Sequence, residues 1–327
     1  MSSFNILCTA AGRRVSLLRH LKKTLTELNL TGHVIAADAG SSAPAGFIAD
    51  DYINVPKVSS PDYIDALVSV CKEKSIKLLV SLIDTDLTLL SENREKFKVI
   101  GTEVLVCDYD TNQICFDKKN TYEFFVKNKI DTPHTYSNQE LEDIAESDFP
   151  LLVKPWDGSC SVGVHVVSSR KELNFFKDYV NNAMVQEYIQ GDEYTCDAYV
   201  DFKGKVRCVV PRLRLETRGG EVSKGLTVND PEIIAAVTRV LNALPHAVGC
   251  MTVQCFKQPD GSISFIEINP RFGGGHPLTI HAGADFPKWI IQELTGRKCE
   301  AHQECWKDDL AMLRYDDEII VKGEDIR

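Results

Sequence analysis

A row of polar side chains near residue 270 of this 327-residue chain has the residue types and spacing of a divalent-cation site. Glu267, Asn269 and Arg271 recur at every second position, and successive strand side chains alternate between faces, so all three should share one face. Gln254 can reach them if its strand pairs with this one through the turn at 259–261. Hard oxygen ligands beside a guanidinium suit Mg²⁺ that bridges the β- and γ-phosphates of ATP, and a purely structural row is the alternative. The apolar residues left for packing are Phe265, Ile266 and Ile268.

A lysine ends an apolar strand and is followed by a loop of small residues. Lys154 closes the strand 151–154, and the loop 157–163 can turn its backbone N–H groups toward phosphate oxygens because few bulky side chains shield them. A solvated lysine and ordinary turn glycines are the alternative reading. The loop candidates are Gly158, Ser159, Ser161, Val162 and Gly163. Neither G-x-x-x-x-G-K-[ST] nor G-x-G-x-x-G after a strand occurs, which excludes the P-loop and dinucleotide-binding patterns.

Two carboxylates lie in a strand-to-strand connector about thirty residues after this loop. Glu187 could accept a hydrogen bond from an adenine amino group while the following backbone reads the ring edge, and Glu193 could bind ribose hydroxyls. Surface decoration of a hairpin explains the same residues equally simply.

Further residues are candidates for holding a phosphate or a substrate. Arg212, Arg214 and Lys224 form a basic run that could hold a γ-phosphate or a substrate carboxylate, although arginines alternating with leucines also describe a solvated strand face. His276 follows three glycines and could touch substrate. Asp84 follows an apolar strand, at the carboxyl end where open α/β sheets bind ligands, and helix capping is its alternative role.

The elements that must position these residues change character along the chain. The first hundred residues alternate short apolar runs with amphipathic segments, a rhythm that predicts a doubly wound parallel sheet. Later the segments 151–154 and 164–167 are joined by a loop alone, which predicts an antiparallel hairpin. The predicted strands are 4–9, 34–38, 78–81, 151–154, 164–167, 193–200, 206–214, 249–256 and 262–269. The predicted helices are 10–28, 61–74, 86–95, 118–128, 171–181, 231–244 and 285–295.

Taken together, Lys118, Lys154 with its loop, the two connector carboxylates and the Glu-x-Asn-x-Arg row follow the order and spacing of the ATP-grasp superfamily. The chain resembles most the carbamoyl-phosphate-synthase large-subunit-like branch, which includes stand-alone carboxylate–amine ligases. The resemblance spans nearly the whole chain and implies a fold of α/β and α+β class. It implies an N-terminal doubly wound parallel βα domain at 1–107, then a two-lobed ATP-grasp domain with mainly antiparallel sheets, its small lobe at 108–190 and its large lobe at 191–327.

The resemblance also implies roles for individual residues. The implied ATP-binding residues are Lys118, Lys154, the 157–163 loop closing over the phosphates, Glu187, Tyr188 and Ile189 at adenine, and Glu193 at ribose. The implied Mg²⁺ ligands are Glu267 and Asn269, with Gln254 at a position where carbamoyl-phosphate-synthase relatives have a metal-ligating glutamine. Catalytic roles fall to Arg271, Lys154 and Lys224.

The implied reaction joins a carboxylate to an amine at the expense of ATP. A carboxylate is a poor electrophile, and phosphorylation converts its oxygen into a leaving group, so an acyl phosphate, ADP and phosphate are expected. Two alternatives are phosphorylation of bicarbonate or carbamate and an ATP-binding regulatory protein without catalysis.

Composition limits the partners. The net charge of −10 opposes binding to nucleic acid, and no run approaches the roughly 20 apolar residues that cross a bilayer. The eleven cysteines include no C-x-x-C pair, which disfavours a zinc or redox site. We therefore expect a cytoplasmic enzyme with small-molecule carboxylate and amine substrates and no nucleic-acid or membrane partner, and a homodimer is an open prospect.

Overall fold

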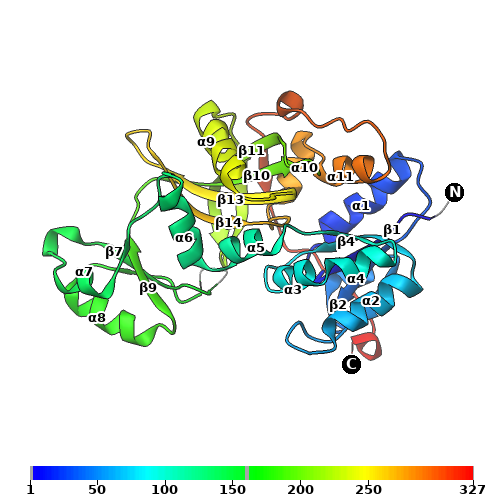
Figure 1. The fold of residues 1–327 in the computed structure, drawn as a ribbon, viewed down its shortest axis with the longest axis horizontal. Helices are drawn as coiled ribbons and strands as arrows, with labels where there is room; N and C mark the ends of the chain where they lie inside the picture. Colours follow the sequence, from blue (N-terminus) through cyan, green and yellow to red (C-terminus); the bar gives the residue numbers. More distant parts are fainter. Residues whose placement is uncertain (1–2, 159–161, 327) are drawn as a thin grey trace.

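The computed structural model describes residues 3–158 and 162–326 and contains three β-sheets (Figure 1). The first is parallel, with strand order β3-β2-β1-β4-β5. Its strands are β1 (Asn5–Thr9), β2 (Val34–Asp38), β3 (Asp51–Asn54), β4 (Ile76–Ser81) and β5 (Glu103–Leu105). Its helices are α1 (Val15–Glu27), α2 (Tyr63–Glu73), α3 (Leu87–Glu92) and α4 (Arg94–Val99), with a 3-10 turn η1 (Pro44–Phe47). From β1 the chain adds β2 and β3 on one side, and then β4 and β5 on the other side. The strand order therefore reverses between the neighbouring strands β1 and β4.

The second sheet is antiparallel and stands apart at the left of Figure 1. It has the strand order β6-β9-β7-β8 and encloses its own small apolar core. Its strands are β6 (Thr135–Tyr136), β7 (Leu151–Pro155), β8 (His165–Val167) and β9 (Ala183–Glu187). Two helices, α7 (Asn138–Glu142) and α8 (Arg170–Tyr179), and a 3-10 turn η2 (Glu146–Asp148) complete this part. Ser137 and Ser169 cap the two helices through their hydroxyl groups.

The third sheet is a six-stranded antiparallel one, in the order β14-β13-β10-β11-β12-β15. Its strands are β10 (Asp192–Val200), β11 (Val206–Arg218), β12 (Glu221–Thr227), β13 (Gly249–Lys257), β14 (Ile263–Asn269) and β15 (Ala311–Leu313). The accompanying helices are α5 (Tyr109–Phe116), α6 (Lys118–Lys127), α9 (Pro231–Ala243), α10 (His276–Ala282) and α11 (Phe286–Leu294), with 3-10 turns η3 (Gln303–Cys305) and η4 (Gly323–Ile326).

One apolar core joins the first and third sheets. Ile6 of β1 and Leu18 of α1 share a cluster of buried side chains with Tyr199 of β10 and with Phe286 and Trp289 of α11. A second cluster covers the opposite face of the large sheet beneath α9. The shared core fixes the carboxyl edge of the parallel sheet against the loops that follow β14.

The predicted fold class is confirmed: a parallel sheet precedes two antiparallel ones, and β7 and β8 form the expected hairpin. Several elements were not predicted, including β3, β5, β6, β12, β15, α5, α7 and α10, and the single helix expected at 86–95 is two helices that meet at Asn93. None of the described helices is both long and apolar enough to cross a membrane.

Candidate active site

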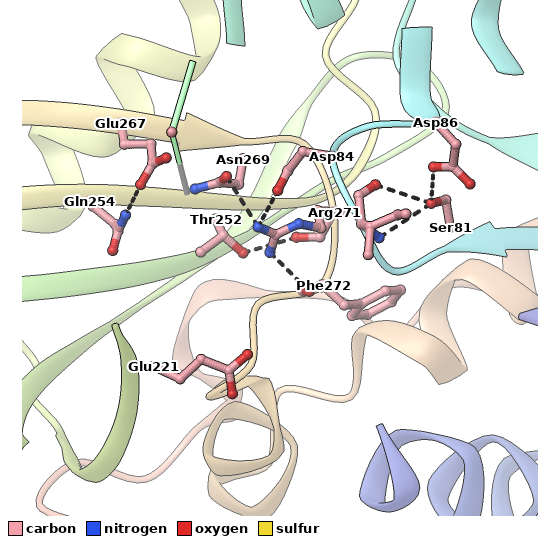
Figure 2. A network of polar contacts seen from close by, with 12 residues as sticks. Ser81, Asp84, Asp86, Glu221, Thr252, Gln254, Glu267, Asn269, Arg271 and Phe272 are labelled. Carbon is pink, nitrogen blue, oxygen red and sulfur yellow. Dashed lines mark hydrogen bonds and ion pairs between the residues drawn. The ribbon is translucent and has the colours of Figure 1, made fainter. Parts of the chain in front are cut away.

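The predicted polar row forms at the end of β14. Gln254 of β13 lies opposite Glu267, and its amide donates a hydrogen bond to that carboxylate. Asn269 ends the strand, and a tight turn brings Arg271 back so that its Nη2 lies 3.2 Å from Asn269 Oδ1. Figure 2 shows the Arg271 guanidinium between Asn269 and Asp84. Glu267, Asn269 and Arg271 therefore lie on one side of the strand, as their spacing predicts.

A β-bulge corrects the prediction for one apolar residue of this strand. Gln254 pairs with Glu267 but Cys255 pairs with Phe265, so Ile266 is an extra residue that faces no partner. Phe265 and Ile268 are fully buried in the core, as expected. Ile266 instead lines a cavity together with Glu267, because the bulge turns two consecutive side chains toward the same side.

Two lysines approach the Glu267 carboxylate from different elements. Lys154, on β7, is only 8% exposed. Lys118 begins α6, and Asp117 caps that helix. Lys118 Nζ lies 3.9 Å from Glu267 Oε1 and donates a hydrogen bond to the Gly158 carbonyl. Burial lowers the pKa of Lys154 to about 8, with attraction from Glu267 opposing the fall and repulsion from Lys118 adding to it. Burial works to raise the pKa of Glu267, but Lys118, the Gln254 hydrogen bond, Lys154 and Arg271 together lower it.

A cavity of about 270 Å³ opens between the second and third sheets beside these lysines. Glu187 lies at its rim, where its carboxylate accepts a hydrogen bond from the His134 backbone N–H at 3.3 Å. The apolar side chains that line it include Leu152, Val164, Ile189, Phe256 and Ile266. Apolar walls with a few polar groups beside them suit a planar heterocycle such as a purine ring.

Glu193 and Arg214 connect the first cavity to the polar row. Arg214 Nη1 lies 2.9 Å from Glu193 Oε1 and donates to Gln254 Oε1 at 2.7 Å. Burial raises the pKa of Glu193 and Arg214 opposes that rise. Because Arg214 is itself largely buried, the three side chains form a fixed link along one wall.

A second cavity of about 410 Å³ continues from the first toward the parallel sheet. The two cavities share six lining residues, so they form one continuous cleft. The shared residues are Lys118, Gly158, Arg214, Gly220, Gln254 and Glu267. Asp84, from the loop after β4, lines this second cavity and holds Arg271 through a 2.6 Å contact to Nη2. The pKa of Arg271 is raised because Asp84 outweighs the opposing effect of burial.

Two of the predicted residues lie differently from what their roles require. Lys224 Nζ pairs with Glu216 at 2.6 Å, its side chain is 47% exposed, and it lines neither cavity. His276 is buried beneath the glycine loop, 3.1 Å from Asp197, so it does not reach the cleft. The basic run that includes Lys224 and the three glycines before His276 suggested otherwise, because the long-range packing was invisible in the sequence.

Arg212 is held by the same buried acid. Its Nε and Nη2 donate to the two oxygens of Asp197 at 3.0 and 2.9 Å, and burial of Asp197 is outweighed by Arg212 and His276, which lower the pKa of that carboxyl. Its remaining Nη1 has no hydrogen-bond partner among the described residues, and Arg212 still lines the second cavity. A Cβ on Gly275 would lie 2.2 Å from Nη1, so glycine is required there.

The small-residue loop is described only at its ends. Gly158 and Val162 line the first cavity, whereas Gly163, in the left-handed region at φ +74°, does not. Tyr188 also lines the first cavity. Ser159 and Ser161 lie outside the described residues.

The sequence-based search missed Arg14 and Glu221, which line the second cavity opposite Asp84. Arg14 follows β1 in the same way that Asp84 follows β4, so its position at a carboxyl strand end was the available signal. Glu221 gave none, because β12 itself was not predicted.

Comparisons with known proteins agree with this architecture. Residues 6–105 match a family model described as PylC-like, N-terminal domain, residues 118–214 match the D-ala D-ala ligase C-terminus, and residues 180–316 match ATP-grasp in the biosynthetic pathway with Ter operon. D-alanine–D-alanine ligase A of Bacillus cereus is 29% identical over 148 residues, which cover 40% of this chain and 49% of that protein. The chain thus spans about half the length of this curated relative.

Two solved structures share the fold over most of the chain. The biotin carboxylase of Campylobacter jejuni superposes with a TM-score of 0.75 at 17% identity, covering 95% of this chain and 74% of that one. The L-amino acid ligase of Bacillus licheniformis superposes with a TM-score of 0.69 at 19% identity, covering 93% and 76%. At these identities the superpositions establish the common fold.

Proposed function

The chain belongs to the ATP-grasp superfamily, and on that premise we propose that it is an ATP-dependent carboxylate–amine ligase. The reaction converts ATP, a carboxylate and an amine into ADP, phosphate and an amide through an acyl phosphate. The observation that carries the proposal is the convergence of Lys118, Lys154 and Glu267 in one cleft, with Asn269 and Arg271 beside them. Lysine and arginine side chains beside a candidate Mg²⁺ ligand suit phosphoryl transfer, since the reaction depends on positioning and on neutralising the charge of the phosphates.

The residues of the polar row fit Mg²⁺. Glu267 offers a carboxylate, and Asn269 and Gln254 offer amide oxygens, all of them hard ligands. With one carboxylate in the set, phosphate oxygens and water would have to supply the remaining ligands, as is usual for Mg²⁺ bound with a nucleotide. When bound, the ion neutralises charge on the phosphates and orients them for in-line transfer.

The protein groups then have separate tasks. The first cavity binds the adenine through its apolar walls, with Glu187 and the backbone at 188–189 on the ring edge and Glu193 at the ribose. Lys118 and Lys154 bind the phosphates from the side opposite Glu267. Arg271, held by Asp84, stabilises the transferred phosphoryl group at the carboxylate substrate.

A screen of carboxylate and amine pairs, scored separately for ADP and phosphate release, tests this function. We expect stoichiometric ADP and phosphate that depend on both substrates and on Mg²⁺. Release of AMP and pyrophosphate would contradict transfer of the γ-phosphoryl group. ATP binding without turnover across a broad panel would favour a regulatory protein, and turnover with bicarbonate alone would favour carbamoyl-phosphate-synthase chemistry.

We also propose the domain division at 107/108 and 190/191. Each sheet falls within one of these ranges, since β5 ends at Leu105 and β9 ends at Glu187. Limited proteolysis followed by mass spectrometry tests these boundaries. A homodimer and a cytoplasmic location remain predictions, and light scattering of the purified protein tests the former.

A further inference from the structure

The far end of the second cavity lies at the point where the strand order of the parallel sheet reverses. Arg14 follows β1 and Asp84 follows β4, and these two strands are neighbours at the reversal of the strand order. In open α/β sheets, ligands bind in the crevice outside the carboxyl ends of such strands. The fold therefore places a ligand site between these two side chains, beyond the residues assigned to ATP.

The Arg14 guanidinium lies near a carboxylate but beyond hydrogen-bond distance from it. Its side chain is 19% exposed, and the nearest carboxylate oxygen, Glu221 Oε1, is 3.7 Å from Nη2. Within the described part of the chain, no hydrogen bond is donated by the Arg14 guanidinium. A Cβ on Gly274 would lie 2.7 Å from Arg14 Nη1 and 3.1 Å from Glu221 Oε1, so a glycine is required for this close approach. Such a buried fork of N–H donors is suited to a carboxylate.

Asp84 presents the complementary group. Its Oδ2 binds Arg271 at 2.6 Å, while its Oδ1 is buried without a hydrogen-bond partner among the described residues. An unpaired buried acceptor is costly, so a donor is expected to face it when the site is filled. Because Asp84 also holds Arg271, a donor on Oδ1 would lie beside the position where the acyl phosphate forms.

The charges of this end of the cavity distinguish between ligand classes. Arg14 and Arg271 are balanced by Asp84 and Glu221, all four of which line the cavity. Arg212, which also lines it, is balanced by the buried Asp197. A ligand with one positive or donor group and one negative group matches this arrangement without a change in net charge. A phosphate ester, with a charge of about −1.5 to −2, would meet two carboxylates.

We propose that the amine substrate is an α-amino acid, whose carboxylate is bound by Arg14 and whose nitrogen faces Asp84 Oδ1. This inference rests on the proposed ligase function. The nitrogen lone pair attacks the acyl carbon, the C–N bond forms, the bond from that carbon to the phosphoryl oxygen breaks, and phosphate leaves. The proton lost by the nitrogen passes to Asp84 and from there to the departing phosphate or to solvent.

The test is binding of paired ligands to the protein loaded with Mg²⁺ and ADP, measured by ligand-observed NMR. The probes are the proteinogenic amino acids and D-alanine, each compared with its carboxamide, which keeps the amine and removes the negative charge. We expect at least one amino acid to bind about 10- to 100-fold more tightly than its amide, the range of a charge-assisted contact. Arg14→Met should remove that preference and Arg14→Lys should keep part of it.

Arg13→Met is the matched control. Arg13 is adjacent, lies 3.8 Å from the same Glu221 carboxylate, is 79% exposed and does not line the cavity, so its loss should leave the preference intact. Equal binding of acids and amides by the wild-type protein, or an unchanged preference in a folded Arg14→Met variant, would overturn the inference. So would tighter binding of phosphoethanolamine than of every amino acid. If the substrate screen gives ADP with amines that lack a carboxylate, the ligase stands and the amino-acid assignment fails.

Discussion

Replacing Lys154 with methionine should stabilise the free protein and weaken its affinity for ATP. The pKa of this lysine falls from the usual 10.5 to about 8, mainly because the side chain is buried. A fall of about 2.5 in pKa corresponds to roughly 3 kcal/mol of unfavourable free energy for keeping the ammonium charged in the folded state at pH 7. Methionine has a similar length and no charge, so Lys154→Met should recover up to that amount in the free energy of unfolding. Nucleotide affinity should fall about 10- to 100-fold with loss of the charge-assisted contact to phosphate.

The pH dependence of this difference has a definite sign. The unfolded lysine keeps a pKa near 10.5, so between about pH 8 and 10.5 the unfolded state binds one more proton than the folded state. The free energy of unfolding of the wild-type protein should therefore rise with pH in this window relative to that of Lys154→Met. The gap of roughly 3 kcal/mol at pH 7 should close as the pH approaches 10.5.

Urea titrations followed by circular dichroism at pH 7, 8, 9 and 10 measure the gap. The matched control is Lys171→Met, which replaces an exposed lysine on α8, a helix in the same part of the structure as β7. This substitution should change the free energy of unfolding by no more than about 0.5 kcal/mol at every pH. If Lys154→Met proved less stable than the wild-type protein at pH 7, or if the gap did not change with pH, Lys154 would not be a buried ammonium and the site geometry would be refuted.

Three further changes separate the roles of other residues. Glu267→Gln should lower kcat about 10²- to 10³-fold, and chelation of Mg²⁺ should have the same effect on the wild-type enzyme; full activity in either case contradicts the metal assignment. Asp197→Leu leaves the fully buried Arg212 without its counter-charge and should cost about 3–5 kcal/mol of stability, much of it restored by adding Arg212→Met, as urea titration would show. Lys224→Met should leave kcat/KM within about twofold of the wild-type value, because the exposed ion pair of Lys224 with Glu216 contributes little free energy. A larger loss would show that Lys224 acts in the cleft.

The sequence was informative wherever local pattern and chemistry coincide. The alternation at Glu267, Asn269 and Arg271 survives in the structure because a paired strand and the turn after it keep that order. The β1 to β4 rhythm gave the parallel sheet because strands covered on both faces are continuously apolar. Lys154 and Lys118, far apart in sequence, meet Glu267 because separate elements converge on it, and only the order of the motifs suggested this.

What the sequence could not give depends on tertiary contacts. The strand β12 is polar and follows two glycines, so its composition favours a turn over a strand. Pairing with β11 and β15 makes it a strand instead. Its absence from the prediction hid Glu221. The bulge at Ile266 is a register difference between two strands, which no single strand encodes. His276 was expected at the substrate because of the glycines before it, whereas those glycines allow Arg14 and Arg212 to approach the loop.

The acyl phosphate is tested most directly by following oxygen from the carboxylate substrate. With a carboxylate labelled by ¹⁸O, ATP and the amine identified in the screen, we expect one labelled oxygen in each inorganic phosphate released. Glu267→Gln should release labelled phosphate about 10²- to 10³-fold more slowly. Unlabelled phosphate would contradict the acyl phosphate, and label recovered in AMP would show that the carboxylate attacks the α-phosphate instead.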